Sequence, residues 1–320
     1  MRDLKITAFS VAALIALLAA GLLLPSWADF LLIIAFSKGL AALGLVLLLR
    51  SGLLSFGQGL FYCVGGYGAG LLMLWGGVND AVLLVCGGGI FALMAGFIIG
   101  SLVAGYRKIY FATLTLALSM LVYGAATKAD ILGGSDGLNL HAPTFFGWRA
   151  GSANASVYAL YVFLTVLLVI LAGLCRAHFW SVRGLLSLGV RDNEIRVEYL
   201  GASVRRVVVE NFSIAAFLGG VGGAINALAL GHIDPELAFW TTSGEFVFVA
   251  ILAGQVSVAA VFAASVMLEV VRSWSSQYFP NVWQMTLGIF MLAIIFFLPD
   301  GLGALLRRCR HLSTVERDTK

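Results

Sequence analysis

Charged residues are scarce in this sequence. Asp, Glu, Lys and Arg make up 11% of its 320 positions, whereas hydrophobic residues make up 61%. An average soluble domain is about a quarter charged and about half apolar. This shortage of charge argues against a water-soluble fold.

Signals of metal binding, cross-linking and catalysis are equally few. The four cysteines lie far apart and form no C-x-x-C pair, so neither a zinc site nor a disulfide framework is indicated. The four histidines are scattered and form no H-E-x-x-H motif. The chain has no G-x-x-x-x-G-K-S/T motif, so it cannot hydrolyse ATP through a P-loop. We therefore expect no enzyme, no metal site and no cofactor bound by this chain.

Long apolar runs are what the sequence has in abundance. Stretches of about 20 apolar residues match the length of a membrane-crossing helix, and their lack of alternation argues against a barrel. We expect an all-α integral membrane protein, a polytopic helical bundle of about ten spans with one short or broken. The expected spans are 6–24, 30–49, 53–75, 81–104, 109–127, 157–175, 208–230, 242–254, 257–275 and 283–305. The first run exceeds the apolar part of a signal peptide, so we interpret it as a retained span.

The basic residues predict the direction of these spans. Short cytoplasmic loops are rich in Lys and Arg, and this rule places 16 of the 20 basic residues on one face, with Arg272 among those outside. Both termini are then cytoplasmic. The same parity requires the apolar segment 242–275 to turn back, and residues 254–257, with a glycine and two polar side chains, mark the expected break. A shallow re-entrant loop would preserve the parity as well.

Five motifs lie in register along the chain. They are LSFGQGLF at 54–61 with GGY at 65–67, YFATLTLA at 110–117, GGSDGL at 133–138, RDNEI at 191–195 with Gly201, and LPDGL at 298–302. In this order and spacing they resemble the permeases of branched-chain amino acid ABC transporters, of the longer of the two paired types. The chain departs from that family at Lys108, where a glycine is usual, and at 253–255, where the family usually carries a Gly-Gly…Gly-Pro signature.

The resemblance implies the membrane-spanning permease subunit of an ATP-binding-cassette importer for branched-chain amino acids, in a bacterial-type plasma (inner) membrane. A single transmembrane permease domain would cover 1–306, with a cytoplasmic tail at 307–320. The implied partners are two ATPase subunits that use ATP, a second homologous permease, a periplasmic or extracellular solute-binding protein and membrane lipid, but no nucleic acid. Related importers of urea, amides, nucleosides or aromatic acids stay open as alternatives. An ion-coupled carrier is a further alternative, although no matching inverted repeat is visible.

A cytoplasmic loop, 176–206, is the expected contact with the ATPases. In the family that the chain resembles, a short helix in such a loop fits a cleft on the nucleotide-binding subunit. We expect this helix between Arg191 and Gly201, with acids near its start, where they complement the helix dipole, and Gly201 as a left-handed cap. The coupling residues would be Arg191, Asp192, Asn193, Glu194 and Gly201. An ordinary solvated basic loop is the alternative.

Polar side chains in or near the spans are the candidates for the transport pathway. They are Ser55, Gln58, Tyr67, Thr113, Thr115 and Glu245. The glycines between 52 and 70 would also allow close helix packing without any role in transport. Lys38, Glu245 and Glu269 are charges expected in or near spans, where charge is costly and a functional role is the usual explanation. A position at the membrane surface is the alternative for each of them.

The loop after the fifth span contains a glycine-rich turn that we expect outside. Its residues Gly133, Gly134, Ser135, Asp136 and Gly137 would dock a solute-binding protein or brace a gate. A plain turn explains the same composition. An intramembrane enzyme would need paired Asp, or Ser with His or Lys, inside the spans, and no such set is visible in the sequence.

Overall fold

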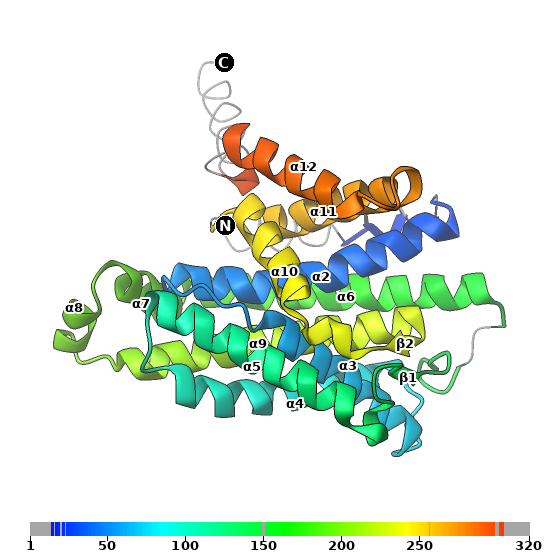
Figure 1. Cartoon of the computed structure of the whole chain (residues 1–320), viewed down its shortest axis with the longest axis horizontal. Coiled ribbons are helices and arrows are strands. Elements are labelled where there is room, and N and C mark those ends of the chain that lie inside the picture. Colours follow the sequence, from blue (N-terminus) through cyan, green and yellow to red (C-terminus); the bar gives the residue numbers. More distant parts are fainter. Residues whose placement is uncertain are drawn as a thin grey trace.

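The computed structural model describes residues 14–15, 17–19, 21–22, 24–148, 151–255, 257–297 and 301–303. The described elements are helices apart from one pair of two-residue strands (Figure 1). The helices are α2 (Ser26–Arg50), α3 (Gln58–Leu74), α4 (Ala81–Val103), α5 (Lys108–Lys128), α6 (Ala153–Trp180), α7 (Val182–Asp192), α8 (Glu194–Tyr199), α9 (Val204–Leu230), α10 (Trp240–Ala253), α11 (Val258–Tyr278) and α12 (Trp283–Phe297). There are also two short 3-10 helices, η1 (Asp130–Leu132) and η2 (Pro235–Ala238), and the antiparallel strands β1 (Leu138–Asn139) and β2 (His232–Ile233).

Six of the described helices are long and apolar enough to cross a membrane, by length and composition. They are α2, α4, α5, α6, α9 and α11. The shorter apolar helices α10 and α12 both pack against α11. The expectation of an all-helical, polytopic membrane protein is therefore confirmed.

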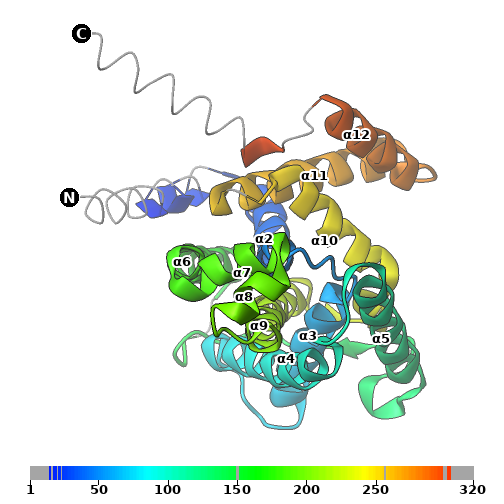
Figure 2. The ribbon, with the colours of Figure 1, turned by 90° about the vertical axis from the view of Figure 1, so that its left-hand side faces the viewer.

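The helices α2 and α9 form the buried centre of the bundle. Both are covered along most of their length, whereas α4, α5, α6 and α11 expose much of theirs. On α9 pack α3 and α4, and on α2 pack α6, α10 and α11 (Figure 1 and Figure 2). Small residues permit the closest contacts: a β carbon on Gly65 of α3 would lie 2.1 Å from the Gly220 carbonyl oxygen of α9. The glycine-rich stretch therefore serves close helix packing.

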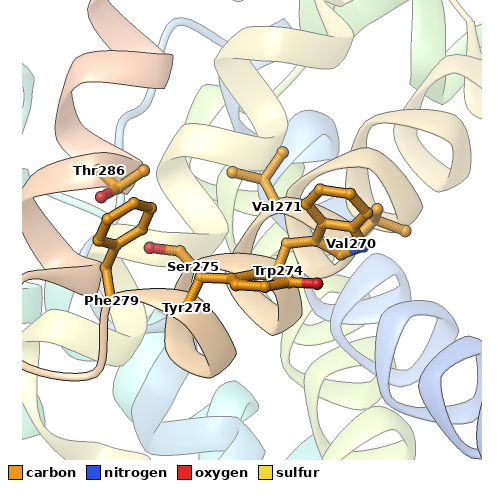
Figure 3. A pocket seen from close by; sticks show the side chains of 7 residues that line it. All are labelled: Val270, Val271, Trp274, Ser275, Tyr278, Phe279 and Thr286. Carbon is orange, nitrogen blue, oxygen red and sulfur yellow. The ribbon is translucent and has the colours of Figure 1, made fainter.

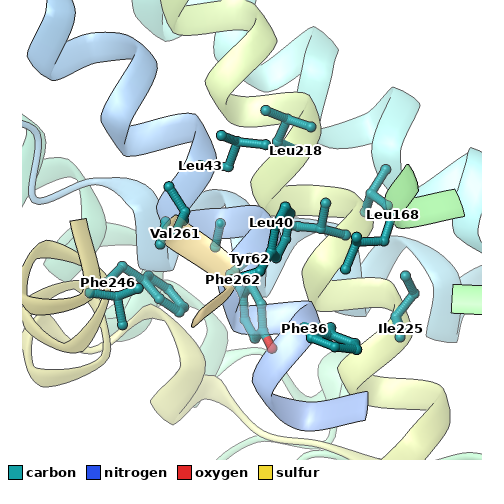
Figure 4. Packing of buried hydrophobic residues seen from close by; sticks show 14 of the residues in the cluster. Phe36, Leu40, Leu43, Tyr62, Leu168, Leu218, Ile225, Phe246, Val261 and Phe262 are labelled. Atoms are coloured by element: carbon teal, nitrogen blue, oxygen red, sulfur yellow. The ribbon is translucent and has the colours of Figure 1, made fainter. Parts of the chain in front are cut away.

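Aromatic and aliphatic side chains fill the space between α2, α3, α10 and α11. Figure 4 shows Phe36 and Leu40 of α2 near Tyr62 of α3, Phe246 of α10 and Phe262 of α11. The rings of Tyr62 and Phe246 have centroids 5.1 Å apart, and those of Phe36 and Phe262 are 6.2 Å apart. Both distances are typical of stabilising aromatic pairs. This packing holds α10 and α11 against the central helix.

The expected break in the segment 242–275 is confirmed. The helix α10 ends at Ala253, Gly254 has a φ of +72°, and α11 begins at Val258. Residues with a side chain rarely adopt this φ, so a glycine suits the end of the helix. The helices α10 and α11 pack against each other, so the chain turns here instead of continuing as one helix.

Other boundaries differ from the sequence expectation. The span expected at 53–75 is wrong at its start, because residues 51–57 form no helix and α3 begins at Gln58. The span expected at 157–175 extends further in both directions, as α6. Lys108 opens α5 with a φ of +52°, a backbone conformation that glycine adopts at less cost. The expected first span, 6–24, lies largely outside the described residues, and the tail at 307–320 lies entirely outside them.

Candidate functional site

Two segments that interrupt the α-helices lie close together inside the bundle, where a β carbon on Gly59 of α3 would lie 2.9 Å from the Leu237 carbonyl oxygen of η2. Residues 51–57 precede α3, and residues 231–239, which include β2 and η2, precede α10. The short helix η2 packs against α3 and α5. Irregular backbone at membrane depth is tolerated only where protein or a watery cavity shelters it. We name these two segments the discontinuity; many transporters form their substrate site where helices are interrupted in this way.

Side-chain hydroxyl groups replace missing helical hydrogen bonds at the discontinuity. The Phe56 amide donates to Thr115 Oγ1 of α5 at 3.2 Å, and the Gly59 amide donates to Ser243 Oγ of α10 at 2.9 Å. Ser119 Oγ of α5 donates to the last carbonyl of η2 at 2.7 Å. Ser119 and Ser243 were not among the sequence candidates, because no local pattern distinguishes them from other serines in spans. The three bonds tie the starts of α3 and α10 to α5.

Three of the predicted pathway residues lie at the discontinuity. Ser55 and Gln58 are fully buried, and Thr115 is nearly so. Gln58 donates through Nε2 to the Ala215 carbonyl of α9 at 2.7 Å, while its buried Oε1 has no partner among the described residues. A buried polar atom normally has a protein or water partner. Within the described part of the chain, the Gln58 oxygen therefore lacks the partner that such an atom normally has.

Tyr67 and Thr113 lie away from this cluster. Tyr67 is buried nearer the other end of α3, and its hydroxyl also has no partner among the described residues. Thr113 is exposed, and its hydroxyl donates to the Ile109 carbonyl one turn earlier in α5, at 3.0 Å. Residues two positions apart on a helix do not share a face, so Thr113 cannot join Thr115. The assignment of both residues to the pathway stays a prediction.

Glu245, the last pathway candidate, belongs to a network of four charges. Its carboxylate accepts from Lys38 of α2 at 3.2 Å and from Arg272 of α11 at 2.9 Å, and Lys38 also donates to Glu269 of α11 at 2.9 Å. Arg272, expected on the outer side at the end of the span 257–275, lies within α11 and pairs with Glu245. The need of every intramembrane charge for a partner could have indicated that Glu245 pairs with a basic residue, but not with which one.

Tyr62 connects this network with the discontinuity. Its hydroxyl shares a hydrogen bond with Ser37 Oγ, next to Lys38, at 3.1 Å. Its ring packs on Phe246, next to Glu245, and the whole side chain is buried. Tyr62 of α3 therefore contacts α2 and α10 at the residues next to Lys38 and Glu245.

The segment expected to contact the ATPases folds as two short helices, α7 and α8. Asn193 caps α8, since its Oδ1 accepts from the Arg196 amide at 3.0 Å. Gly201 has a φ of +83°, which agrees with its expected left-handed conformation. The expected position of Asp192 at the start of this helix is wrong, because Asn193 interrupts the helix with an extended backbone and Asp192 ends α7. Its coupling role stays a prediction.

Ionic and polar contacts anchor these two helices to the membrane helices. Glu194 of α8 forms an ion pair with Arg107 in the α4–α5 turn. Arg191 of α7 donates to the side-chain oxygen of Gln255 in the α10–α11 break, at 2.6 Å. Arg50, at the end of α2, lies 3.5 Å from the Gln255 carbonyl oxygen. Three basic residues expected on one face thus lie at one end of the bundle.

The glycine-rich loop lies at the opposite end of the bundle, beside the β1–β2 pair (Figure 1). Its three glycines have positive φ, and a β carbon on Gly137 would lie 1.9 Å from the Ile233 carbonyl oxygen. Ser135 and Asp136 are exposed at its tip. The loop backbone therefore packs against the strand that leads to η2, as a brace would, while the exposed tip is open to a docking partner. Both roles stay predictions.

The other candidates for ligand binding are a metal cluster and a surface groove. Among the described residues, no three His, Cys, Asp or Glu side chains gather where they could hold a metal ion. A groove of about 370 Å³ lies between α11 and α12 (Figure 3). Its lining residues are Val270, Val271, Trp274, Ser275, Tyr278, Phe279 and Thr286. This largely apolar lining presents no charged group to a polar substrate.

A sequence match identifies the family to which this architecture belongs. The family described as "Branched-chain amino acid transport system / permease component" matches residues 27–298. The matched range contains the discontinuity, the four charges and the anchored helices α7 and α8. The chain belongs to this family.

Two relatives of this permease carry the name "High-affinity branched-chain amino acid transport system permease protein LivM", one from Escherichia coli (strain K12) and one from Salmonella typhimurium (strain LT2). Each is 28% identical to this chain over 279 residues, which cover 79% of the chain and 64% of the relative. The chain thus matches slightly less than two thirds of the length of these relatives. No solved structure matches it significantly. The resemblance inferred from the motifs is confirmed, and the permease is a multi-pass membrane transport subunit.

Proposed function

We propose that this permease is the membrane-spanning subunit of an ATP-driven importer for branched-chain amino acids. The anchored segment of α7 and α8 is the observation that carries the proposal, because it reaches the helix break through Gln255 and the α4–α5 turn through Arg107. A transport subunit without a P-loop needs a surface through which ATPases can move it. The family match supports the class of transporter, and the names of the LivM relatives support the substrate.

Ten crossings with two cytoplasmic termini complete the proposed topology. The break at 254–257 lies beside Arg50 and Arg191, at the end of the bundle where basic residues gather. The helix α10 has 14 residues, or about 21 Å of helix, less than the hydrocarbon thickness of about 30 Å. Residues 231–239, which include η2, supply the remaining depth. In this topology α10 is the short eighth crossing.

Alternating access is the proposed mechanism. ATP binding and hydrolysis on two partner ATPases would displace α7 and α8, and the contacts of Arg107 and Arg191 would pass this movement to the membrane helices. Because α3 and α10 both begin at the discontinuity, their first turns can shift without the rupture of a continuous helix. A solute-binding protein would deliver the substrate at the outer loop around Asp136, and a second homologous permease would form the other half of the pathway.

Reconstitution tests this function. Proteoliposomes would contain the permease with two ATPases and a second permease encoded beside it, with ATP inside and the binding protein outside. We expect ATP-dependent accumulation of labelled leucine by the assembled transporter and none by this chain alone. ATP-driven accumulation by this chain alone would contradict the proposal, and accumulation driven by an ion gradient would identify a carrier instead. Uptake of urea, amides or aromatic acids in place of leucine would keep the importer class and change the substrate.

A further inference from the structure

Lys38, Glu245, Glu269 and Arg272 form a charge network without net charge. Lys38 lies near the middle of α2 and Glu269 near the middle of α11. The side chains of Lys38 and the two acids are between 11% and 19% exposed, whereas Arg272 is 33% exposed. The network therefore lies deep within the spans and reaches the surface of the chain mainly through Arg272.

Helix packing does not explain these charges. The desolvation of a buried ion pair offsets most of its attraction, and apolar residues of similar volume often hold helices together as well or better. Contact with the ATPases does not explain them either, because the anchors of α7 and α8 run through Arg107 and Gln255. Intramembrane charges that serve neither purpose usually line the path of a substrate or an ion.

A zwitterionic ligand matches the network in charge and in surroundings. A free amino acid carries one carboxylate and one ammonium group near neutral pH. It can therefore take the place of one base and one acid in the network without leaving an unpaired ion. Phe246 follows Glu245 in α10, and with Tyr62 and Phe262 it forms an apolar wall nearby (Figure 4). Such a wall suits an aliphatic side chain.

We propose that the charge network holds the backbone charges of the amino acid substrate. The inference rests on the proposed function and names its binding subsite. When α10 separates from α2 and α11, Lys38 and Arg272 bind the α-carboxylate, while Glu245 and Glu269 bind the α-ammonium group. Arg272 is placed to break its ion pair with Glu245 first, because it is the most exposed member of the network. Its guanidinium also lies 5.2 Å from the centre of the Trp283 ring of α12, which attracts a cation.

Binding of leucine to the assembled transporter in nanodiscs, without the solute-binding protein, tests this site. Saturation-transfer NMR would compare leucine with leucinamide, which lacks the carboxylate, and with N-acetylleucine, which lacks the ammonium group. We expect saturable binding of leucine and at least about tenfold weaker binding of each analogue, since each loses one set of charge-assisted hydrogen bonds. Equal affinities for the three compounds, or no saturable binding of leucine, would overturn the proposal.

Paired substitutions separate recognition from folding. Lys38→Gln with Glu269→Gln removes one charge of each sign, so that no buried ion is left alone. We expect wild-type amounts of this variant in the membrane and about a tenfold loss of leucine affinity. The matched control, Lys128→Gln with Asp130→Asn, removes one exposed charge of each sign outside α7 and α8 and should stay within about twofold of wild type. Unchanged affinity in the first variant would contradict the site.

A reversed network excludes a purely structural role. The combination of Lys38→Glu, Glu245→Lys, Glu269→Lys and Arg272→Glu keeps every contact of the network attractive but reverses its direction. A network that merely joins helices would regain leucine binding in this variant, whereas we expect binding no better than in the doubly neutral variant. Measurements of uptake separate the two proposals. If the wild-type transporter shows no ATP-driven leucine uptake, the proposed function is contradicted. If the wild type and the doubly neutral variant show equal uptake and equal leucine affinity, only the proposed site is contradicted.

Discussion

Gly223 shows, at the scale of single residues, how closely the central helices approach. A β carbon at this position of α9 would lie 1.8 Å from the carbonyl oxygen of Tyr62 in α3. Tyr62 also contacts Ser37 and Phe246, beside the charge network. A side chain at Gly223 would therefore push away a residue that connects the discontinuity with the charges.

Gly223→Ala is expected to lower the free energy of unfolding by about 1 to 3 kcal/mol, the usual cost of overpacking. Gly124→Ala in α5 is the control, because nothing lies within 4 Å of its β carbon. Alanine favours a helix over glycine by about 1 kcal/mol, so the control should be neutral or stabilising. Thermal unfolding in one detergent would compare the two variants. Equal melting temperatures would show that α3 and α9 can separate without cost.

Local chemistry made some residues of the site predictable, and distant partners made others unpredictable. Gly201 and Gly254 have the positive φ expected of glycines at helix ends. Thr113 was grouped with Thr115 because one motif contains both, although they lie on different faces of α5. Arg272 pairs with Glu245 across 27 positions and two helices, so no local pattern could name this partner.

At the scale of elements, hydropathy identified the helices better than their ends. The expected spans 81–104 and 109–127 match α4 and α5 within one residue. The first turn of the span expected at 53–75 is missing because its backbone bonds to another helix, as Phe56 does to Thr115. The helix α7 was not expected, because its sequence mixes polar and apolar residues. Its start depends on a cap in which Ser181 Oγ accepts from the Gly184 amide.

The ion pair of Arg107 and Glu194 leads to a prediction about the coupling helices. Glu194→Lys places two cations together and should release α8 from the α4–α5 turn, while insertion into the membrane stays unchanged. Leucine uptake and substrate-stimulated ATP hydrolysis should fall together by about tenfold, equivalent to ~1.4 kcal/mol, since a hydrogen bond to a charged group contributes about this much. Both activities would be measured in the same proteoliposomes.

An exchange of the two charges shows whether Glu194 acts through its contact with Arg107. Arg107→Glu combined with Glu194→Lys restores the attraction, so most of both activities should return. Glu198→Lys, on the exposed face of α8, controls for the added positive charge. Loss of activity in Glu194→Lys without recovery in the exchanged pair would mean that Glu194 contacts an ATPase directly instead of the α4–α5 turn.

Across the whole molecule, polar groups gather at the two ends of the bundle and in its middle. Arg50 and Arg191 meet the α10–α11 break at one end. The β1–β2 pair and the loop beside it lie at the other end (Figure 1). Lys38 and Glu269 of the charge network lie near the middle of α2 and α11. Counting of basic residues predicts this polarity from the sequence. It does not predict the depth at which α10 begins, because hydroxyl contacts such as that of Ser243 with the Gly59 amide determine that depth.

This polarity predicts which residues an impermeant thiol reagent can reach. In a variant without the native cysteines, a cysteine at Asp136 or Ser276 should react from outside, since both positions are exposed. A cysteine at Ser257, beside the break, or at Tyr199 of α8 should react only after the membrane is permeabilised. The helix α11 has 21 residues, or about 32 Å, enough to cross the hydrocarbon layer, so its two ends should lie on opposite faces. Labelling of the cysteine at Ser257 from outside would mean that a re-entrant loop takes the place of two crossings, with Tyr199 still inside. Protection of the cysteine at Asp136 would reject the topology altogether.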